Sequence, residues 1–216
     1  MARHPLDIAL QGACPTVMVP LYGDSAPLTS PGHRFLSASV GLWIEINRPW
    51  MKLVWPIATQ TDFPTPYCEL EKKIDLAFGK VSTDLINQFI SDAEIAFPNE
   101  FDAWLVWNDQ AKQLRYHAMQ TIAAGPGRLK AKSPDLAEHE SLAVNLHSHG
   151  IYPAYFSSED HFDDRDEVKI AGVFGSFVGK PLTSAYRNYT TAFRICAGGE
   201  SISLGSKISV TISRGA

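Results

Sequence analysis

The first strong pattern in the chain is a strict alternation of apolar and polar residues. The apolar positions are Leu36, Ala38, Val40, Leu42, Ile44 and Ile46. Because side chains two residues apart in a strand share one face, residues 34–47 predict one half-buried strand. Residues 48–58 predict its antiparallel neighbour after a turn at residues 47–49.

This pattern predicts a β-rich domain over residues 1–75 and a second domain over residues 76–216. The proline-rich stretch at residues 61–67 fits either a linker or a loop packed on the next domain. The sequence does not reveal the job of the first domain. One hypothesis is that it recruits a substrate or a partner, because it is extra to the second domain.

The second domain begins with a helical period. The apolar residues on one helical face are Leu85, Ile86, Phe89, Ile90 and Ala93. They predict a helix over residues 83–96, which ends before Pro98 because proline cannot continue it.

The elements that follow are mostly strands. Strands are predicted over residues 101–107, 113–122, 142–149 and 168–177, and two or three antiparallel strands over residues 190–212. Residues 125–135 are predicted as a surface loop, and Gly198-Gly199 as a hairpin turn. The order of elements predicts an α/β fold, a sandwich around a mixed sheet.

Composition narrows the classes of partner. The chain has 216 residues, with 19 Lys and Arg against 23 Asp and Glu, and no basic run. Neither nucleic acid nor an anionic membrane is therefore an expected partner. The three cysteines are far apart and indicate inert thiols in a reducing compartment. With no apolar stretch of signal or membrane-spanning length, the expected protein is soluble and cytoplasmic.

The candidate chemistry lies in residues 145–167, "NLHSHGIYPAYFSSEDHFDDRDE". If residues 142–149 form a strand, His147 and His149 point to the same side with Ser148 turned away. Two imidazoles on one face are half of a tetrahedral zinc site. A helix that starts with Ser157 as N-cap would direct this hydroxyl and the carboxylate of Asp160 back toward the strand end.

A simpler interpretation of the same residues is structural. Ser157 and Asp160 have the spacing of a helix capping box, and "DDRDE" at residues 163–167 is typical of a solvated helix face. His117 and His139 have no partner at metal-binding spacing, so we expect both to be strand or loop histidines rather than ligands.

His147-Ser-His149, seven residues, Ser157, two residues and Asp160 resemble the JAMM motif of the MPN+/JAB metallopeptidases at every position and spacing. The resemblance covers roughly residues 80–200. More narrowly, the chain is similar to the PRTRC system protein A branch of prokaryotic JAB proteins. The resemblance implies a JAB/MPN fold with a cytidine-deaminase-like core.

The family also uses a glutamate where its first helix gives way to a strand, and residues 82–108 resemble that passage. Glu100 is the matching residue, although the family usually continues with Cys-Gly rather than Phe101-Asp102. The rivals fit less well. Glu138 and Glu140 lie at odd offsets from His147, and Glu45 lies on the polar face of an earlier strand.

The resemblance implies one zinc ion per chain, held by His147, His149 and Asp160 with water as the fourth ligand. It also implies that Glu100 is the general base for that water and that Ser157 stabilises the oxyanion. The expected activity is cleavage of a peptide or isopeptide bond at the C-terminal tail of a ubiquitin-like protein. Activating- or conjugating-enzyme-like proteins of the same system are further expected partners.

Three other classes compete with this interpretation. A JAB-fold binding or scaffold protein without turnover would keep the fold, but such relatives usually lack the histidines. A zinc deaminase would need His-x-Glu and Pro-Cys-x-x-Cys, and neither motif is present. A cysteine hydrolase is disfavoured because no cysteine lies near a histidine in a recognisable arrangement.

Overall fold

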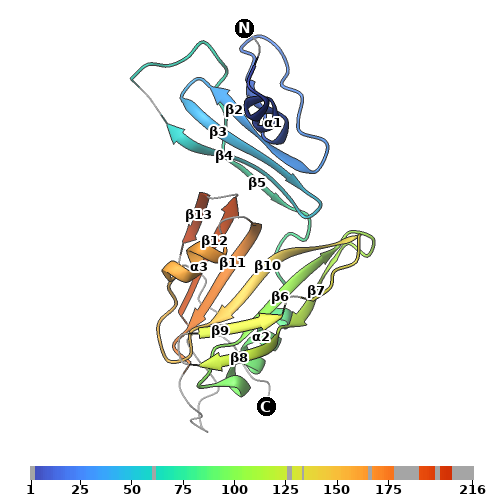
Figure 1. Cartoon of the computed structure of the whole chain (residues 1–216), viewed down its shortest axis with the longest axis vertical. Helices are drawn as coiled ribbons and strands as arrows, with labels where there is room; N and C mark the ends of the chain where they lie inside the picture. The colour runs from blue at the N-terminus through green and yellow to red at the C-terminus, as the bar shows by residue number, and fades with distance from the viewer. Residues whose placement is uncertain are drawn as a thin grey trace. The chain divides into compact units, whose positions relative to one another are not determined.

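The computed structural model describes residues 3–59, 62–125, 128–132, 134–164, 167–177, 190–197 and 200–205 (Figure 1). The chain divides into two compact units, Met1–Gly79 and Lys80–Ala216. Among the described residues, no helix combines the length and the apolar character needed to cross a bilayer.

The first unit is a helix and one five-stranded sheet. The elements are α1 (Pro5–Ala13), β1 (Thr16–Met18), β2 (Gly32–Ala38), β3 (Gly41–Arg48), β4 (Met51–Thr59) and β5 (Lys73–Leu76), and the strands pair in this order. Its core includes Val19, Leu36, Ala38 and Trp43. The β-rich character and the antiparallel partner expected after the turn at residues 47–49 are confirmed. Helix α1, with no buried residue, was not predicted.

The single strand predicted over residues 34–47 is wrong. The chain turns at residues 39–40, and β2 pairs antiparallel with β3. Alternation hides this turn because the polar–apolar pattern continues through it in phase. Gly41 adopts a φ of +124° next to the backbone of Ala58, which a side chain could not do without strain.

Residues 62–67 pack on the first sheet. Thr65 donates from its backbone N–H to the carbonyl of Ser39 at 2.9 Å and from its hydroxyl to the carbonyl of Ala38 at 2.8 Å. The chain then returns to the same sheet as β5, which runs across the boundary expected at residue 75. This segment is therefore part of the first unit.

The second unit is built on a six-stranded sheet. Its elements are α2 (Thr83–Ala96), β6 (Asp102–Asn108), β7 (Gln113–Ala118), β8 (Gln120–Gly125), β9 (Arg128–Lys132), β10 (Glu140–Ser148), α3 (Ser158–Asp163), β11 (Val168–Gly175), β12 (Thr190–Ala197) and β13 (Glu200–Gly205). The strand order is β13-β12-β11-β10-β6-β7, with β8 and β9 as a separate hairpin. Strands β10 and β11 are parallel and their other pairings are antiparallel, so the predicted α/β fold with a mixed sheet is confirmed.

Most predicted elements of this unit are found, with two corrections. The helix over residues 83–96 is confirmed residue for residue. The strand predicted over residues 113–122 is two strands, β7 and β8, and the loop predicted over residues 125–135 contains β9. Gly198, Gly199 and any strand after residue 205 lie outside the described residues.

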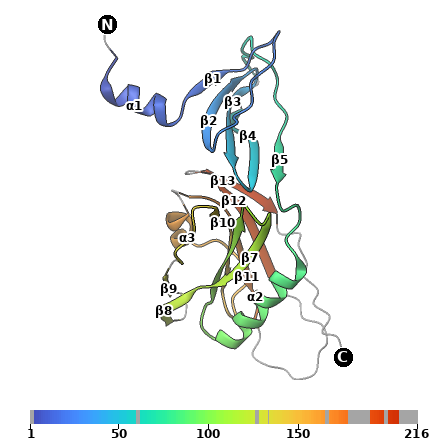
Figure 2. The ribbon, with the colours of Figure 1, turned by 90° about the vertical axis from the view of Figure 1, so that its right-hand side faces the viewer.

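The two faces of the six-stranded sheet differ. Helix α2 covers an apolar face, where Phe89 lies 5.1 Å from Phe174 and Phe174 lies 5.8 Å from Phe193 between ring centroids. On the opposite, polar face the strands carry Asp102, Asn145, His147, Lys169 and Arg194 in neighbouring register positions. Figure 2 shows α2 and α3 on opposite sides of the sheet.

Candidate metal centre

The two motif histidines lie side by side at the end of β10. His147 is in the strand and His149 follows directly, with ring centroids 4.7 Å apart. Ser148 is turned to the other face, where it is 1% exposed and its hydroxyl accepts a hydrogen bond from the backbone N–H of Phe101 at 2.9 Å. The predicted alternation around this serine is confirmed.

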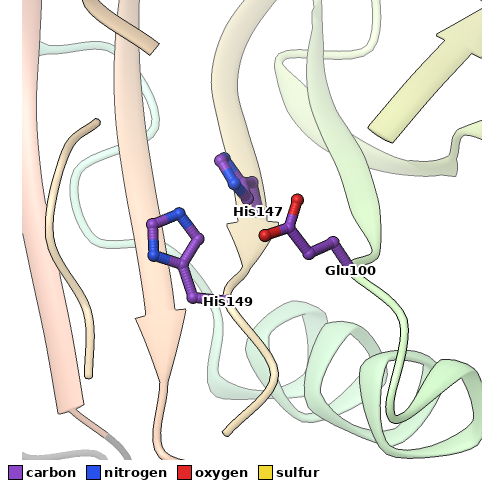
Figure 3. Close-up of side chains that lie close together, drawn as sticks. All are labelled: Glu100, His147 and His149. Atoms are coloured by element: carbon purple, nitrogen blue, oxygen red, sulfur yellow. The ribbon is translucent and has the colours of Figure 1, made fainter. Parts of the chain in front are cut away.

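Glu100 reaches the histidines from a distant part of the chain. It lies between α2 and β6, and the segment is fixed because Ser148 also donates its backbone N–H to the carbonyl of Phe101 at 2.9 Å. One ligand atom from each of Glu100, His147 and His149 lies within 4.8 Å of the others. Figure 3 shows these three side chains pointing toward one another.

Asp160 faces the same histidines from α3. Its Oδ1 is 3.5 Å from Nδ1 of His147, and its Oδ2 is 4.0 Å from Nε2 of His149. The same carboxylate closes a capping box, because Oδ2 accepts from the backbone N–H of Ser157 at 2.6 Å and from its hydroxyl at 2.7 Å. The capping box and the proximity to the histidines are therefore both present, and neither interpretation excludes the other.

The loop after His149 holds this histidine in place. The ring donates to the carbonyl of Pro153, and the ring of Tyr155 lies edge-on at 4.5 Å between centroids. The loop passes so close to β11 that a Cβ on Gly175 would lie 2.3 Å from the carbonyl oxygen of Tyr152. Only glycine permits this approach without displacing the loop.

The electrostatics of the site favour neutral imidazoles. Burial lowers the pKa of His147 to about 4, against the opposing charge of Asp160. Burial also lowers the pKa of His149. Burial raises the pKa of Glu100 to about 7, and the negative charges of Asp160 and Glu159 add to this shift.

The donor set fits zinc. Two neutral imidazoles present the lone pairs that a metal needs, and a carboxylate lies opposite both. Ligands bound at 2.0–2.1 Å in a tetrahedron are about 3.3 Å apart, close to the separation of Asp160 from His147. The distance from Asp160 to His149 is longer, 4.0 Å, and involves the other carboxylate oxygen.

The structure also contains a group of buried charges that was not predicted. Asp164 pairs with Lys169 at 2.8 Å and with Arg194, and Lys169 also pairs with Glu167. Burial alone would raise the pKa of Asp164, but hydrogen bonds from Lys169 and Arg194 outweigh it and hold the pKa below its ordinary value. Asp164 is thus buried, and the solvated helix face predicted for residues 163–167 is wrong at this residue.

The sequence does contain a signal for these buried charges. Lys169 and Arg194 are single basic residues inside the apolar stretches "VKIAGVF" and "TAFRICA". A buried cation requires a paired anion, so each predicts a carboxylate nearby. The sequence alone does not say which carboxylate it is.

The rejected candidates have other partners. Glu45 binds Arg34 at 2.6 Å in the first unit, and Glu140 binds Arg115 at 3.0 Å. All three cysteines are free thiols, and burial raises the pKa of Cys196 to about 12, which opposes a nucleophilic role.

Comparison with known families agrees with the geometry. The family of prokaryotic homologs of the JAB domain matches residues 82–189, which is half of the chain, and a domain of unknown function (DUF2016) matches residues 4–77. No curated protein matches the chain. On the strength of the match over residues 82–189, the chain belongs to the family of prokaryotic homologs of the JAB domain.

Proposed function

We propose that the protein is a zinc-dependent peptidase that hydrolyses a peptide or isopeptide bond at the C-terminal tail of a ubiquitin-like protein. The observation that carries the proposal is the convergence of Glu100, His147 and His149 from two separate segments. Among the residues that the structure describes, the group that could hold a metal consists of Glu100, His147 and His149. The proposal instead takes His147, His149 and Asp160 as the three ligands, because Asp160 faces both histidines, and takes Glu100 as the base beside them.

A bound zinc ion would act as a Lewis acid, polarising the scissile carbonyl and making water acidic enough to react at neutral pH. Glu100 is half-buried beside the histidines, and its pKa of about 7 suits a group that accepts and returns a proton near neutrality. It takes the proton of the attacking water and delivers it to the leaving amine. His147 and His149 stay neutral, as metal ligands must, and hold their places in the ligand set.

Ser157 has a different constraint. Its hydroxyl carries one hydrogen, which is donated to Asp160 in this structure. Stabilising an oxyanion requires that hydrogen to turn toward the substrate, so Ser157 serves either Asp160 or the oxyanion at any moment. We propose that it orients Asp160 in the resting protein and donates to the oxyanion during turnover.

The substrate side of the proposal rests on the motif resemblance and on exposed aromatic residues. Tyr152 and Tyr155 are 54% and 52% exposed beside His149, which suits contact with an extended tail, whereas Phe156 packs inward on Arg194. The proposal places the protein in the PRTRC system protein A branch and in the cytoplasm. Its partners would be a ubiquitin-like protein and the activating- or conjugating-enzyme-like proteins of that system.

The test compares wild type with Glu100→Gln on two substrates, a ubiquitin-like protein fused through its C-terminal tail to a reporter and the same tail linked to a lysine side chain. Zinc per chain is measured on the same preparations. We expect about one zinc in both proteins, cleavage by wild type, and a 10²–10⁴-fold lower rate for the variant. Loss of zinc from Glu100→Gln would contradict the base assignment.

The competing scaffold function gives a different result in the same experiment. A scaffold would bind zinc and the ubiquitin-like protein but cleave neither substrate at any zinc concentration. Cleavage that is equal in wild type and Glu100→Gln would indicate a contaminating protease.

A further inference from the structure

A single buried arginine connects strand β12 to the helix that carries Asp160. Arg194 lies in β12 and is 3% exposed. Its Nη2 donates to the carbonyl of Asp160 at 2.9 Å and to the carboxylate of Asp164, and its Nη1 lies 2.8 Å from Nδ1 of His161.

The same guanidinium also contacts the chain before the helix. Its Cζ lies 3.9 Å from the centroid of the Phe156 ring, in the geometry of a cation–π contact. Arg194 therefore touches residues on both sides of the segment from Ser157 to Asp160. Lys169 holds the other oxygen of the Asp164 carboxylate, since its Nζ lies 2.8 Å from Oδ1 of Asp164.

Helix α3 needs such an anchor. It has six residues, far fewer than an isolated helix requires for stability. The capping box ties Ser157 to Asp160 but does not tie either residue to the sheet that carries the histidines. A metal ligand must be held within about 0.5 Å of its productive position by its supporting residues.

The guanidinium suits this task better than other cations. It is planar and has five N–H donors, so one side chain can bind the Asp160 carbonyl and the Asp164 carboxylate while it packs on the Phe156 ring. A lysine at the same position has one compact ammonium, which could keep the charge pair with Asp164 but not all of these contacts.

From these contacts we infer that Arg194 is a positioning residue, which fixes α3 on the sheet so that the Asp160 carboxylate stays opposite His147 and His149. The inference rests on the proposed function, because it takes Asp160 as a ligand. It goes beyond that proposal by assigning a role in metal affinity to a residue that touches neither the metal ligands' side chains nor the substrate.

The test measures zinc affinity by competition with a chelating dye, together with the visible absorption spectrum after cobalt replaces zinc. We expect Arg194→Lys to bind zinc 10–100-fold more weakly than wild type and to give an altered cobalt spectrum. The matched control is Arg34→Lys in β2, where the arginine also pairs with a carboxylate, Glu45, but in the other unit. We expect this control to match wild type in both readouts.

The two measurements separate positioning from a purely structural role. If Arg194→Lys lowers the unfolding temperature but keeps the zinc affinity and the cobalt spectrum of wild type, the inference is overturned. Should that variant fail to fold, Phe156→Leu removes the ring contacts with Arg194 and His161 and leaves the hydrogen bonds of Arg194 in place. A several-fold loss of zinc affinity is expected, and unchanged affinity would count against the inference.

Asp160→Ala distinguishes failure of the inference from failure of the proposed function. If Asp160→Ala binds zinc as tightly as wild type, the ligand assignment itself is wrong, and the role of Arg194 falls with it. If Asp160→Ala loses zinc while Arg194→Lys and Phe156→Leu keep it, the ligand assignment stands and only the positioning role is refuted.

Discussion

The two faces of the six-stranded sheet are made by the same strands but differ in composition and in role. On the apolar face, Leu105, Leu146 and Ile195 are each 0% exposed and pack with the phenylalanines beneath α2. On the polar face, the intervening residues carry charges and histidines. One face supplies the hydrophobic stabilisation of the unit, and the other holds the candidate site.

The polar face is also where hydrogen bonding is incomplete. Among the described residues of the second unit, the buried side-chain atoms without a hydrogen-bond partner are Asp102 Oδ1, His117 Nε2, Asn145 Oδ1 and Arg194 Nε, and all four lie on the polar face. A buried polar group with no partner at all, water included, costs about 1–3 kcal/mol. Any of these groups that also lacks a water partner lowers the stability of the unit, and burial on the apolar face compensates.

The largest expected effect follows from removing a histidine from the polar face. His147→Ala deletes one of three proposed ligands, so zinc per chain should fall from about one to near zero and cleavage should be lost. Because the side chain is half-buried and makes no apolar core, the zinc-free variant should unfold within about 1 kcal/mol of zinc-free wild type. Elemental analysis and denaturant unfolding test both statements, and retention of zinc would contradict the ligand assignment.

The neighbouring residue on the apolar face should behave in the opposite way. Leu146→Ala leaves a cavity between the sheet and α2, and the free energy of unfolding should fall by 2–5 kcal/mol. The folded variant should still bind about one zinc per chain. Urea unfolding of zinc-free protein provides the measurement, and a loss of zinc equal to that of His147→Ala would mean that the two faces are not independent.

The apolar face was largely predictable from sequence because its signals are local. The 3.6-residue period of α2 and its end before Pro98 are contained in one stretch, and the predicted helix is confirmed at both ends.

Elsewhere in the chain, a turn and a strand were missed. In the first unit, the turn after Ala38 was missed because the alternation of apolar and polar residues continued through it. Strand β9 was missed because "GPGRLKAK" carries the glycine and proline of a loop, and its pairing with β8 is visible only in three dimensions.

The polar face was predictable only in part. His147, His149, Ser157 and Asp160 lie within 14 residues, so strand alternation and helix capping were enough to direct them together. Glu100 comes from a segment 47 residues before His147, and family resemblance rather than periodicity identified it. Lys169, Arg194 and Asp102 were missed because their proximity depends on strand register across four strands.

Asp102 gives a smaller effect that depends on pH. Burial raises the pKa of Asp102 to about 8, although the charge of Lys169 opposes the shift. Between the unfolded pKa near 3.9 and this value, the native state keeps a proton that the unfolded state has lost, so stability falls as pH rises. Asp102→Asn should remove this loss.

The measurement is the free energy of unfolding of zinc-free wild type and Asp102→Asn at pH 5 and pH 7. Wild type should lose up to about 2.7 kcal/mol relative to the variant over this interval, from 1.36 kcal/mol per pH unit. Parallel pH profiles would show that Asp102 is ionised in the native protein and that Lys169 outweighs its burial.

The smallest expected effect compares two glycines of β11 that lie on opposite faces. A Cβ at Gly175 meets the backbone of residues 152 and 154 at 2.3 and 2.4 Å, whereas a Cβ at Gly172 meets the side chains of Phe193 and Leu146 at 2.5 and 3.0 Å. Each alanine substitution overpacks its site and should cost 1–3 kcal/mol of stability.

Only Gly175→Ala should also weaken zinc binding, by several-fold. The backbone that it displaces includes Pro153, whose carbonyl accepts a hydrogen bond from the His149 ring, so the ring loses its orientation. Gly172→Ala displaces only side chains under α2 and should keep the zinc affinity of wild type. Competition with a chelator measures the zinc affinity of both variants. If the two zinc affinities are equal, the loop after His149 absorbs the displacement, and close packing on the polar face does not set the geometry of the ligands.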